Sequence, residues 1–246
     1  DIDNLNGLIE VTNGTYQQEG DPLFQVKRFS LDVNENEVIK VLKLRSGIVD
    51  ADFNGKFSFR NLRKAANNLL RKHLPSYAGE FNVLSPEENL EFEFGIELKN
   101  TDLLSYFFAQ DLAISDSSSF RGSYSSLNDE LFIRGNLHEV TYKNIVFNRV
   151  EIEAENPGKE FQLGVFVKRV NLTDSIYLDD FDVRSFTFND SLGLVIKWDN
   201  DTKVVNKALI QGVASFPKNE EVSFHLEETN ITVAGLEWRV QPDNRL

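Results

Sequence analysis

LEFEFGIEL, residues 90–98, has an apolar side chain at every second position and a glutamate at most of the positions between. Successive side chains of a β-strand point to opposite faces of the sheet. The stretch therefore predicts a strand with one apolar face and one carboxylate-rich face. Its apolar face needs a cover, which could be a second sheet, a helix or a molecule that is not protein.

The same alternation recurs along the whole chain. The apolar positions of these runs are Val49, Ala51, Phe53, Phe57 and Phe59; Phe92, Phe94, Ile96 and Leu98; Val150 and Ile152; Leu163, Val165 and Val167; Leu192, Leu194, Ile196 and Trp198; Val222 and Phe224; Ile231 and Val233. Turn residues such as Asn156-Pro157-Gly158 separate the runs. There is no strand–helix alternation of the kind that marks a parallel sheet. The sequence predicts an all-β, mostly antiparallel fold, with residues 1–246 as a single elongated unit.

One segment, residues 60–74, departs from this pattern and predicts a helix. Its apolar residues at helical spacing are Leu62, Ala66, Leu69, Leu70 and Leu74. Asn61 is a candidate N-cap and Pro75 a stop signal. A second, shorter helix is predicted at about 101–109, with Thr101 as its cap.

The predicted helix is also unusually basic for this chain. Its polar side carries Arg60, Arg63, Lys64, Arg71 and Lys72. Such a helix could lie on anionic lipid headgroups, or it could pack on the sheet while neighbouring carboxylates balance its cations. The second interpretation is favoured.

Composition and motifs exclude several classes of function. The 26 Lys and Arg against 39 Asp and Glu give a net charge of -13, which disfavours binding to nucleic acid. The chain has no cysteine, so thiolate catalysis and Cys-ligated zinc are excluded. His73, His138 and His225 belong to no catalytic motif, and we expect no enzymatic activity and no cofactor.

Acidic and hydroxyl residues leave two alternatives open. Asp174, Asp179, Asp180 and Asp182 could gather a hard cation, but they lack the spacing of a calcium loop, and a solvated strand and turn is preferred. Ser175 and Ser191 fit an Asp-Ser-apolar tripeptide that some bacteria O-glycosylate. Ordinary turn residues are the preferred interpretation there.

Three segments resemble the TamB-like, AsmA-related envelope proteins of Gram-negative bacteria. FNGKFSFRNLRKAANNLLRKHLPSY, residues 53–77, is similar to their strand that leads into a basic helix. LKNTDLLSYFFAQDLAISDSSSFRGSYSS, residues 98–126, resembles a short helix followed by a strand and a Ser/Gly-rich stretch. ITVAGLEWRVQPDNRL, residues 231–246, is similar to their strand ending in Trp-x-Val-x-Pro-Asp-Asn and adds Trp238 to the apolar set. The resemblance covers about residues 45–246.

The resemblance implies a fold and a function. The family's β-rich regions form a long open trough, the β-taco, whose concave face is apolar. Its members are anchored in the inner membrane and cross the periplasm. They are linked to phospholipid transport to the outer membrane and to outer-membrane protein assembly with a TamA-like barrel of the Omp85 superfamily. We expect this chain to be an internal piece of such a protein.

The apolar residues named above, including Trp238, are therefore candidates to line a groove that shields lipid acyl chains. The same residues would suit the closed core of a β-sandwich that recognises glycan or protein through its loops. Alternation alone does not choose between an open trough and a sealed sandwich. An enzyme on a β scaffold is the weakest alternative.

Overall fold

The computed structural model of the chain describes residues 2–17, 24–36, 38–78, 84–85, 88–99, 101, 111–158, 160–188, 190–200, 205–217, 222–227, 229–233 and 235–240. Its strands are β1 (Gly7–Tyr16), β2 (Phe24–Glu35), β3 (Lys40–Ser46), β4 (Val49–Lys56), β5 (Glu91–Leu98), β6 (Leu112–Ile114), β7 (Ser118–Ser125), β8 (Glu130–Tyr142), β9 (Ile145–Glu155), β10 (Gln162–Asn171), β11 (Tyr177–Phe188), β12 (Ser191–Asn200), β13 (Asn206–Ser215), β14 (Ser223–Leu226), β15 (Thr229–Val233) and β16 (Leu236–Val240). Its helices are the 3₁₀ turn η1 (Ile2–Asn4), α1 (Phe59–His73) and the single turn α2 (Pro75–Ala78).

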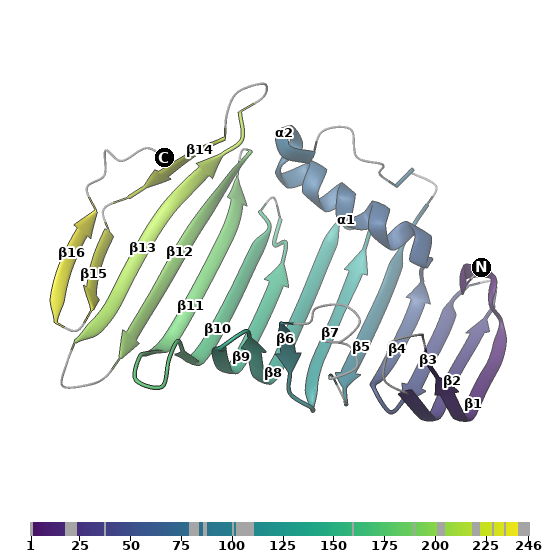
Figure 1. Cartoon of the computed structure of the whole chain (residues 1–246). Coiled ribbons are helices and arrows are strands. Elements are labelled where there is room, and N and C mark those ends of the chain that lie inside the picture. The colour runs from purple at the N-terminus through teal and green to yellow at the C-terminus, as the bar shows by residue number, and fades with distance from the viewer. Residues whose placement is uncertain are drawn as a thin grey trace.

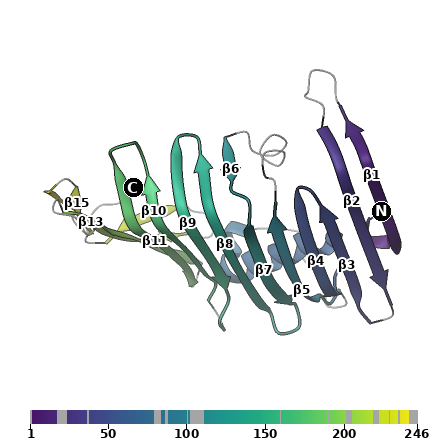
Figure 2. The ribbon, with the colours of Figure 1, turned by 90° about the horizontal axis from the view of Figure 1, so that it is seen from below.

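The strands form one antiparallel sheet that follows chain order almost throughout. The order is β1-β2-β3-β4-β5-β7-β8-β9-β10-β11-β12-β13-β15-β16, with β6 paired to β8 and β14 paired to β13. The two ends of the sheet lie far apart, so the sheet is open (Figure 1, Figure 2). The predicted all-β, antiparallel, open fold with one amphipathic helix is confirmed. The described strands form no second sheet, which leaves the sandwich alternative without its second layer.

Register places the apolar positions of neighbouring strands on one common face. In β4 and β5, Ala51 lies opposite Ile96 and Phe53 opposite Phe94. The glutamates of β5 lie on the other face, as the alternation predicts. We call the face that carries Phe94 the inner face and the opposite one the outer face.

Several strands bend where a residue adopts a left-handed conformation. Arg149 in β9 has φ 53° and Asp180 in β11 has φ 49°, and the register skips the pairs that contain them. Pairing resumes in the same register on both sides of these residues, so no residue is inserted, but the alternation of side chains between the faces is shifted there. Phe147 and Val150, three residues apart, therefore both join one apolar cluster. The bend keeps the inner face apolar while the strand ends change direction.

Helix α1 covers the inner face of the N-terminal half of the sheet (Figure 1). Leu62, Ala65 and Leu69 pack on an apolar cluster that includes Phe57 and Phe92. The interpretation of a helix packed on the sheet is therefore confirmed.

Carboxylates that are distant in the sequence hold both ends of the helical segment. The Asp3 carboxylate accepts hydrogen bonds from the backbone N–H of Phe59 (2.6 Å) and Arg60 (3.1 Å) and from the Ser58 hydroxyl (3.1 Å). The Asp190 carboxylate accepts hydrogen bonds from Ser76 N–H at 3.1 and 3.2 Å. Two such caps satisfy N–H groups that a helix start leaves unpaired.

Three local predictions need correction. Asn61 is not the N-cap, because the helix begins two residues earlier and Ser58 occupies that position. Ala66 is exposed and Ala65 is the buried alanine. Phe59 belongs to α1 rather than to a strand, since β4 ends at Lys56.

The predicted helix at 101–109 lies outside the described residues except for Thr101. That residue is not helical, and its hydroxyl donates a hydrogen bond to the carbonyl oxygen of Ile114.

Candidate functional site: the apolar inner face

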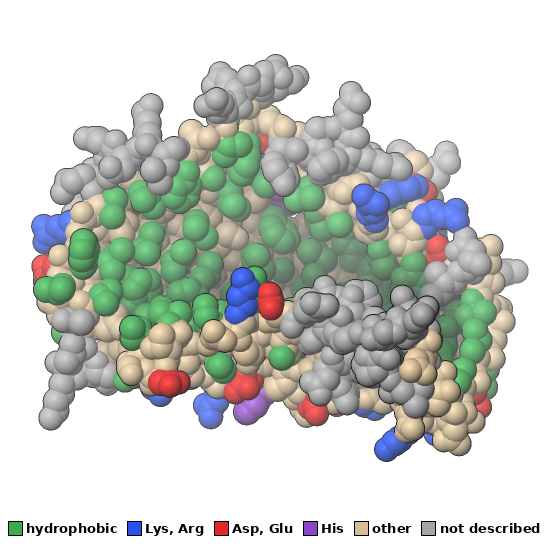
Figure 3. Space-filling view, in the orientation of Figure 1, with side chains coloured by type: hydrophobic (Ala, Val, Ile, Leu, Met, Phe, Trp, Pro, Cys, Tyr) green, Lys and Arg blue, Asp and Glu red, His purple; other side chains and the backbone are tan. Residues whose placement is uncertain are grey.

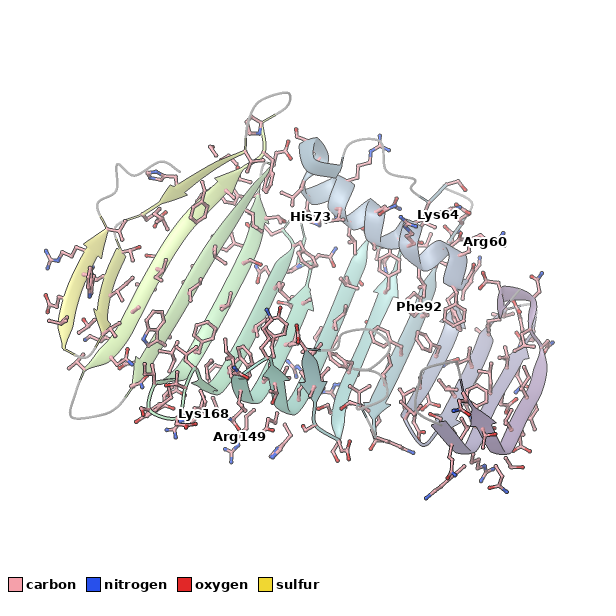
Figure 4. All side chains as sticks on the ribbon, in the orientation of Figure 1. Arg60, Lys64, His73, Phe92, Arg149 and Lys168 are labelled. Atoms are coloured by element: carbon pink, nitrogen blue, oxygen red, sulfur yellow. The ribbon has the colours of Figure 1, made fainter. Side chains whose placement is uncertain are left out.

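The part of the inner face beneath α1 is a closed core. Phe57 and Phe92 are 6% and 8% exposed, and their rings are 5.9 Å apart between centroids. Phe92 lies below the helix in Figure 4. Burial, together with the nearby Asp129, raises the pKa of the Tyr124 phenol at this core to about 12. This region resembles an ordinary helix-on-sheet interface.

The inner face of β9 to β13 is apolar in the same way. Near the strand bends it includes a second buried cluster with Val150 and Val167, against which Ile114 of β6 packs, but no described helix packs over the rest of this face. One row runs through five neighbouring strands: Ile152, Val165, Val183, Ile196 and Ile210, each directly opposite the next. All five side chains are half-buried, because strand neighbours cover their flanks but not their tips. Hydrophobic side chains form a continuous band across this face, with a hollow toward the helix (Figure 3).

The predicted lining residues divide into three groups by exposure. Ala51, Phe57, Phe92, Leu98, Val150 and Val167 are buried. Val49, Phe53, Phe59, Phe94, Ile96, Ile152, Leu163, Val165, Leu192, Leu194, Ile196, Trp198, Phe224 and Ile231 are half-buried. Val222, Val233 and Trp238 are exposed, at 59%, 42% and 63%. The half-buried residues of β9 to β13 are thus the ones best placed to contact a ligand.

Sequence reasoning missed several members of this face, among them Phe181, Val183 and Ile210. Phe181 lies within the acidic stretch Asp179–Asp182 and Val183 directly follows it, and the carboxylates of that stretch suggested a metal site instead. A signal was available, since Tyr177, Phe181 and Val183 occupy odd positions among the acids.

Aromatic rings lie over glycines of neighbouring strands on the same face. A Cβ atom at Gly122 would lie 2.7 Å from the ring of Phe94, and one at Gly135 would lie 2.8 Å from the ring of Phe120. Each pair is also directly opposite in the register. These glycines therefore give the phenylalanine rings room to lie flat on the sheet.

Trp198 is fixed at one end of the open region. Its indole N–H donates to the side-chain oxygen of Asn206 at 3.0 Å, and its ring stacks on Phe181 with centroids 6.4 Å apart. Asn200 beside it is buried and bonds the backbone N–H of Asp179 and the carbonyl of Tyr177. These contacts hold a large aromatic surface rigidly on the inner face.

The residues at and beside the strand bends are charged, and they pair with one another at the rim of the sheet. Arg149 and Lys168 lie at the lower rim of the sheet in Figure 4. Lys168 pairs with Asp180 at 2.6 Å, and Arg169 pairs with Asp179 through bonds of 2.6 and 3.0 Å. The side-chain hydrogen bond to Asp179 raises the pKa of Arg169 above its usual value.

Three of the four aspartates that could have gathered a cation, Asp179, Asp180 and Asp182, are thus engaged in ion pairs. Asp182 pairs with Arg184 at 3.0 Å. Among the residues that the structure describes, no three His, Asp or Glu side chains gather as a metal site would require. Within the same described ranges, no helix combines the length and apolarity needed to cross a membrane. Comparisons with protein-family models, curated proteins and solved structures give no match for this chain.

Proposed function

We propose that this chain is a non-enzymatic segment of a TamB-like periplasmic protein whose apolar face shields the acyl chains of phospholipid. The observation that carries the proposal is the row from Ile152 to Ile210, which is apolar, half-exposed and without a described cover. An apolar area of this kind on a folded protein marks a binding surface. The resemblance of residues 45–246 to the TamB-like family suggests that the ligand is phospholipid, that the protein acts in the periplasm and that the full-length protein is anchored in the inner membrane. It also suggests a supporting role in outer-membrane protein assembly with an Omp85-type barrel.

Such a face would lower the free-energy barrier to moving a phospholipid through water. Exposure of a 16-carbon acyl chain to water costs on the order of 12 kcal/mol at about 0.8 kcal/mol per methylene. A face of Ile, Val and Leu side chains replaces that water with contacts like those of the bilayer interior. Lipid movement along it then needs no chemical step.

Ile196 and Val195 provide a matched test, because they are adjacent, β-branched and half-buried but point to opposite faces of β12. A photoreactive phenylalanine analogue at residue 196 should crosslink phospholipid in cells. The same analogue at residue 195 should crosslink little. Protein purified without added lipid should also carry phospholipid by native mass spectrometry. Equal crosslinking at both positions, or none at residue 196, would rule the proposal out.

A further inference from the structure

The outer face carries a hollow of about 810 Å³ over β8 to β11. Gly164 of β10 lines it and lies directly opposite Glu153 on one side and Arg184 on the other. Phe166 and Phe186 also line the hollow. This hollow is separate from the inner face, because these side chains occupy the alternate strand positions.

Gly164 is not required by the fold. Its φ is outside the left-handed region that favours glycine, and a Cβ atom there would meet only the carbonyl oxygen of Glu153, at 3.9 Å. Gly122 and Gly135 differ, because aromatic rings fill the space above them. A glycine inside a strand weakens it and often marks the close approach of another molecule. The empty space above Gly164 is therefore available to a ligand.

A second glycine repeats this arrangement. A Cβ atom at Gly95 of β5 would have no neighbour within 4 Å, and Gly95 lines a hollow of about 380 Å³. The two hollows share Arg121 and Asn136. The register places Gly95, Arg121, Arg134, Glu153, Gly164 and Arg184 in one transverse row. Four strand spacings separate the two glycines, or about 19 Å, so the row suits an elongated ligand.

The charged side chains that line the larger hollow indicate which class of ligand it could bind. Three arginines and five carboxylates line the larger hollow together. Arg134 pairs with Glu153 and Arg184 with Asp182. An anion would meet carboxylates and a cation would meet guanidinium groups wherever it lay. Hydroxyl groups, in contrast, can donate to the carboxylates and accept from the arginines.

We propose that this outer-face row binds a neutral oligosaccharide. Its hydroxyls hydrogen-bond with Glu153, Arg184 and their neighbours, and its apolar ring faces contact Phe166 and Phe186. The glycines let sugar rings approach the backbone. This site is independent of the lipid-binding face.

Gly164→Val gives a sharp test, because valine favours strands and fills the hollow without a backbone clash. The full chain should first be applied to an array of neutral and charged oligosaccharides, and the best neutral binder then titrated by calorimetry. Gly164→Val should weaken that binding about tenfold or more, while thermal stability stays the same or rises. Gly47→Val is the matched control, because a Cβ atom at Gly47 also meets open space but lies outside both hollows.

Phe166→Leu supplies a second variant that should also weaken binding. The proposal would be overturned if the array showed no binding of neutral oligosaccharides or binding of charged ones only. Full affinity of Gly164→Val for the neutral oligosaccharide would also overturn it. Lipid crosslinking at residue 196 should be unchanged in Gly164→Val, so failure of one site does not imply failure of the other.

Discussion

Ile196 and Phe92 both face inward on alternating strands, yet their surroundings differ. Phe92 is packed beneath α1, whereas Ile196 is half-buried on the uncovered part of the face. We expect Phe92→Asp to destabilise the protein by about 3–5 kcal/mol, because it buries an unpaired charge. Ile196→Asp should cost no more than about 1–2 kcal/mol, because water reaches that position.

Urea denaturation followed by tryptophan fluorescence measures both changes. Ile196→Asp should remain cooperatively folded but lose lipid crosslinking from a photoreactive group at Val183, its direct neighbour on β11. Val195→Asp, on the outer face, is the control and should keep that crosslinking. Collapse of the fold in Ile196→Asp would mean that this face is sealed.

Asp3 is a second residue whose role depends on distant contacts. Burial acts to raise the pKa of its carboxyl, but hydrogen bonds from Phe59, Arg60 and Ser58 and the charge of Lys40 outweigh this and lower it. A lowered folded-state pKa contributes stability that is complete above the unfolded pKa of about 4 and is lost as pH falls through the folded pKa.

Asp3→Ala should therefore reduce stability by about 0.5–2 kcal/mol at pH 7, the usual value of a helix cap. Asp3→Asn is the matched variant, since it keeps hydrogen-bond acceptors and removes the titration. Thermal melts from pH 7 to pH 3 should show a smaller acid-induced loss in both variants than in the wild type. Equal pH profiles in all three proteins would contradict this role.

Helix α1 shows how far local sequence signals reach. The spacing of Leu62 and Leu69 and the stop at Pro75 predicted a helix at 60–74, close to the observed Phe59–His73. The cap was missed because it comes from Asp3, 56 residues before Phe59 in the chain. Local sequence patterns predict which face of a helix is apolar. A capping carboxylate that comes from a distant part of the chain gives no sequence signal near the helix.

The strand bends were also beyond sequence reasoning, because alternation is assumed to be unbroken within a strand. Val167 and Val170 lie on the same face although they are three residues apart. Glycine or asparagine would have indicated a residue with positive φ, but β9 bends at Arg149, a residue type that seldom adopts this conformation.

Arg149→Gly should accordingly stabilise the protein by about 1 kcal/mol, because it removes backbone strain in β9. Arg149→Val should be destabilising, since a β-branched residue tolerates positive φ poorly. Chemical denaturation gives both values. Asn148→Ala, at the neighbouring position in β9, controls for loss of a polar side chain. A stabilising Arg149→Val would show that the bend does not depend on this residue's conformation.

At the scale of the whole molecule, the open sheet settles what the alternation left undecided. Each strand contacts mainly its neighbours, and the inner face has a helix on one half, whereas no described helix covers the other half. The sequence could not distinguish these halves, because Phe92 under the helix and Ile196 beyond it show the same period of two. Which apolar face is covered depends on where the single helix packs.

This asymmetry predicts uneven local stability. In a sheet whose strands contact mainly their neighbours, stability is approximately a sum of local terms, as in repeat proteins. Hydrogen exchange should therefore be slower in β4 and β5, which α1 covers, than in β11 and β12, which no described helix covers. Phospholipid supplied in mixed micelles should slow exchange in β11 and β12 and leave β4 and β5 unchanged, because a ligand stabilises the region to which it binds. Ile196→Asp should remove this protection while α1 stays protected. Slowed exchange in β4 and β5 alone would instead place the lipid beneath the helix, and uniform exchange would mean that the two halves of the face are not distinct.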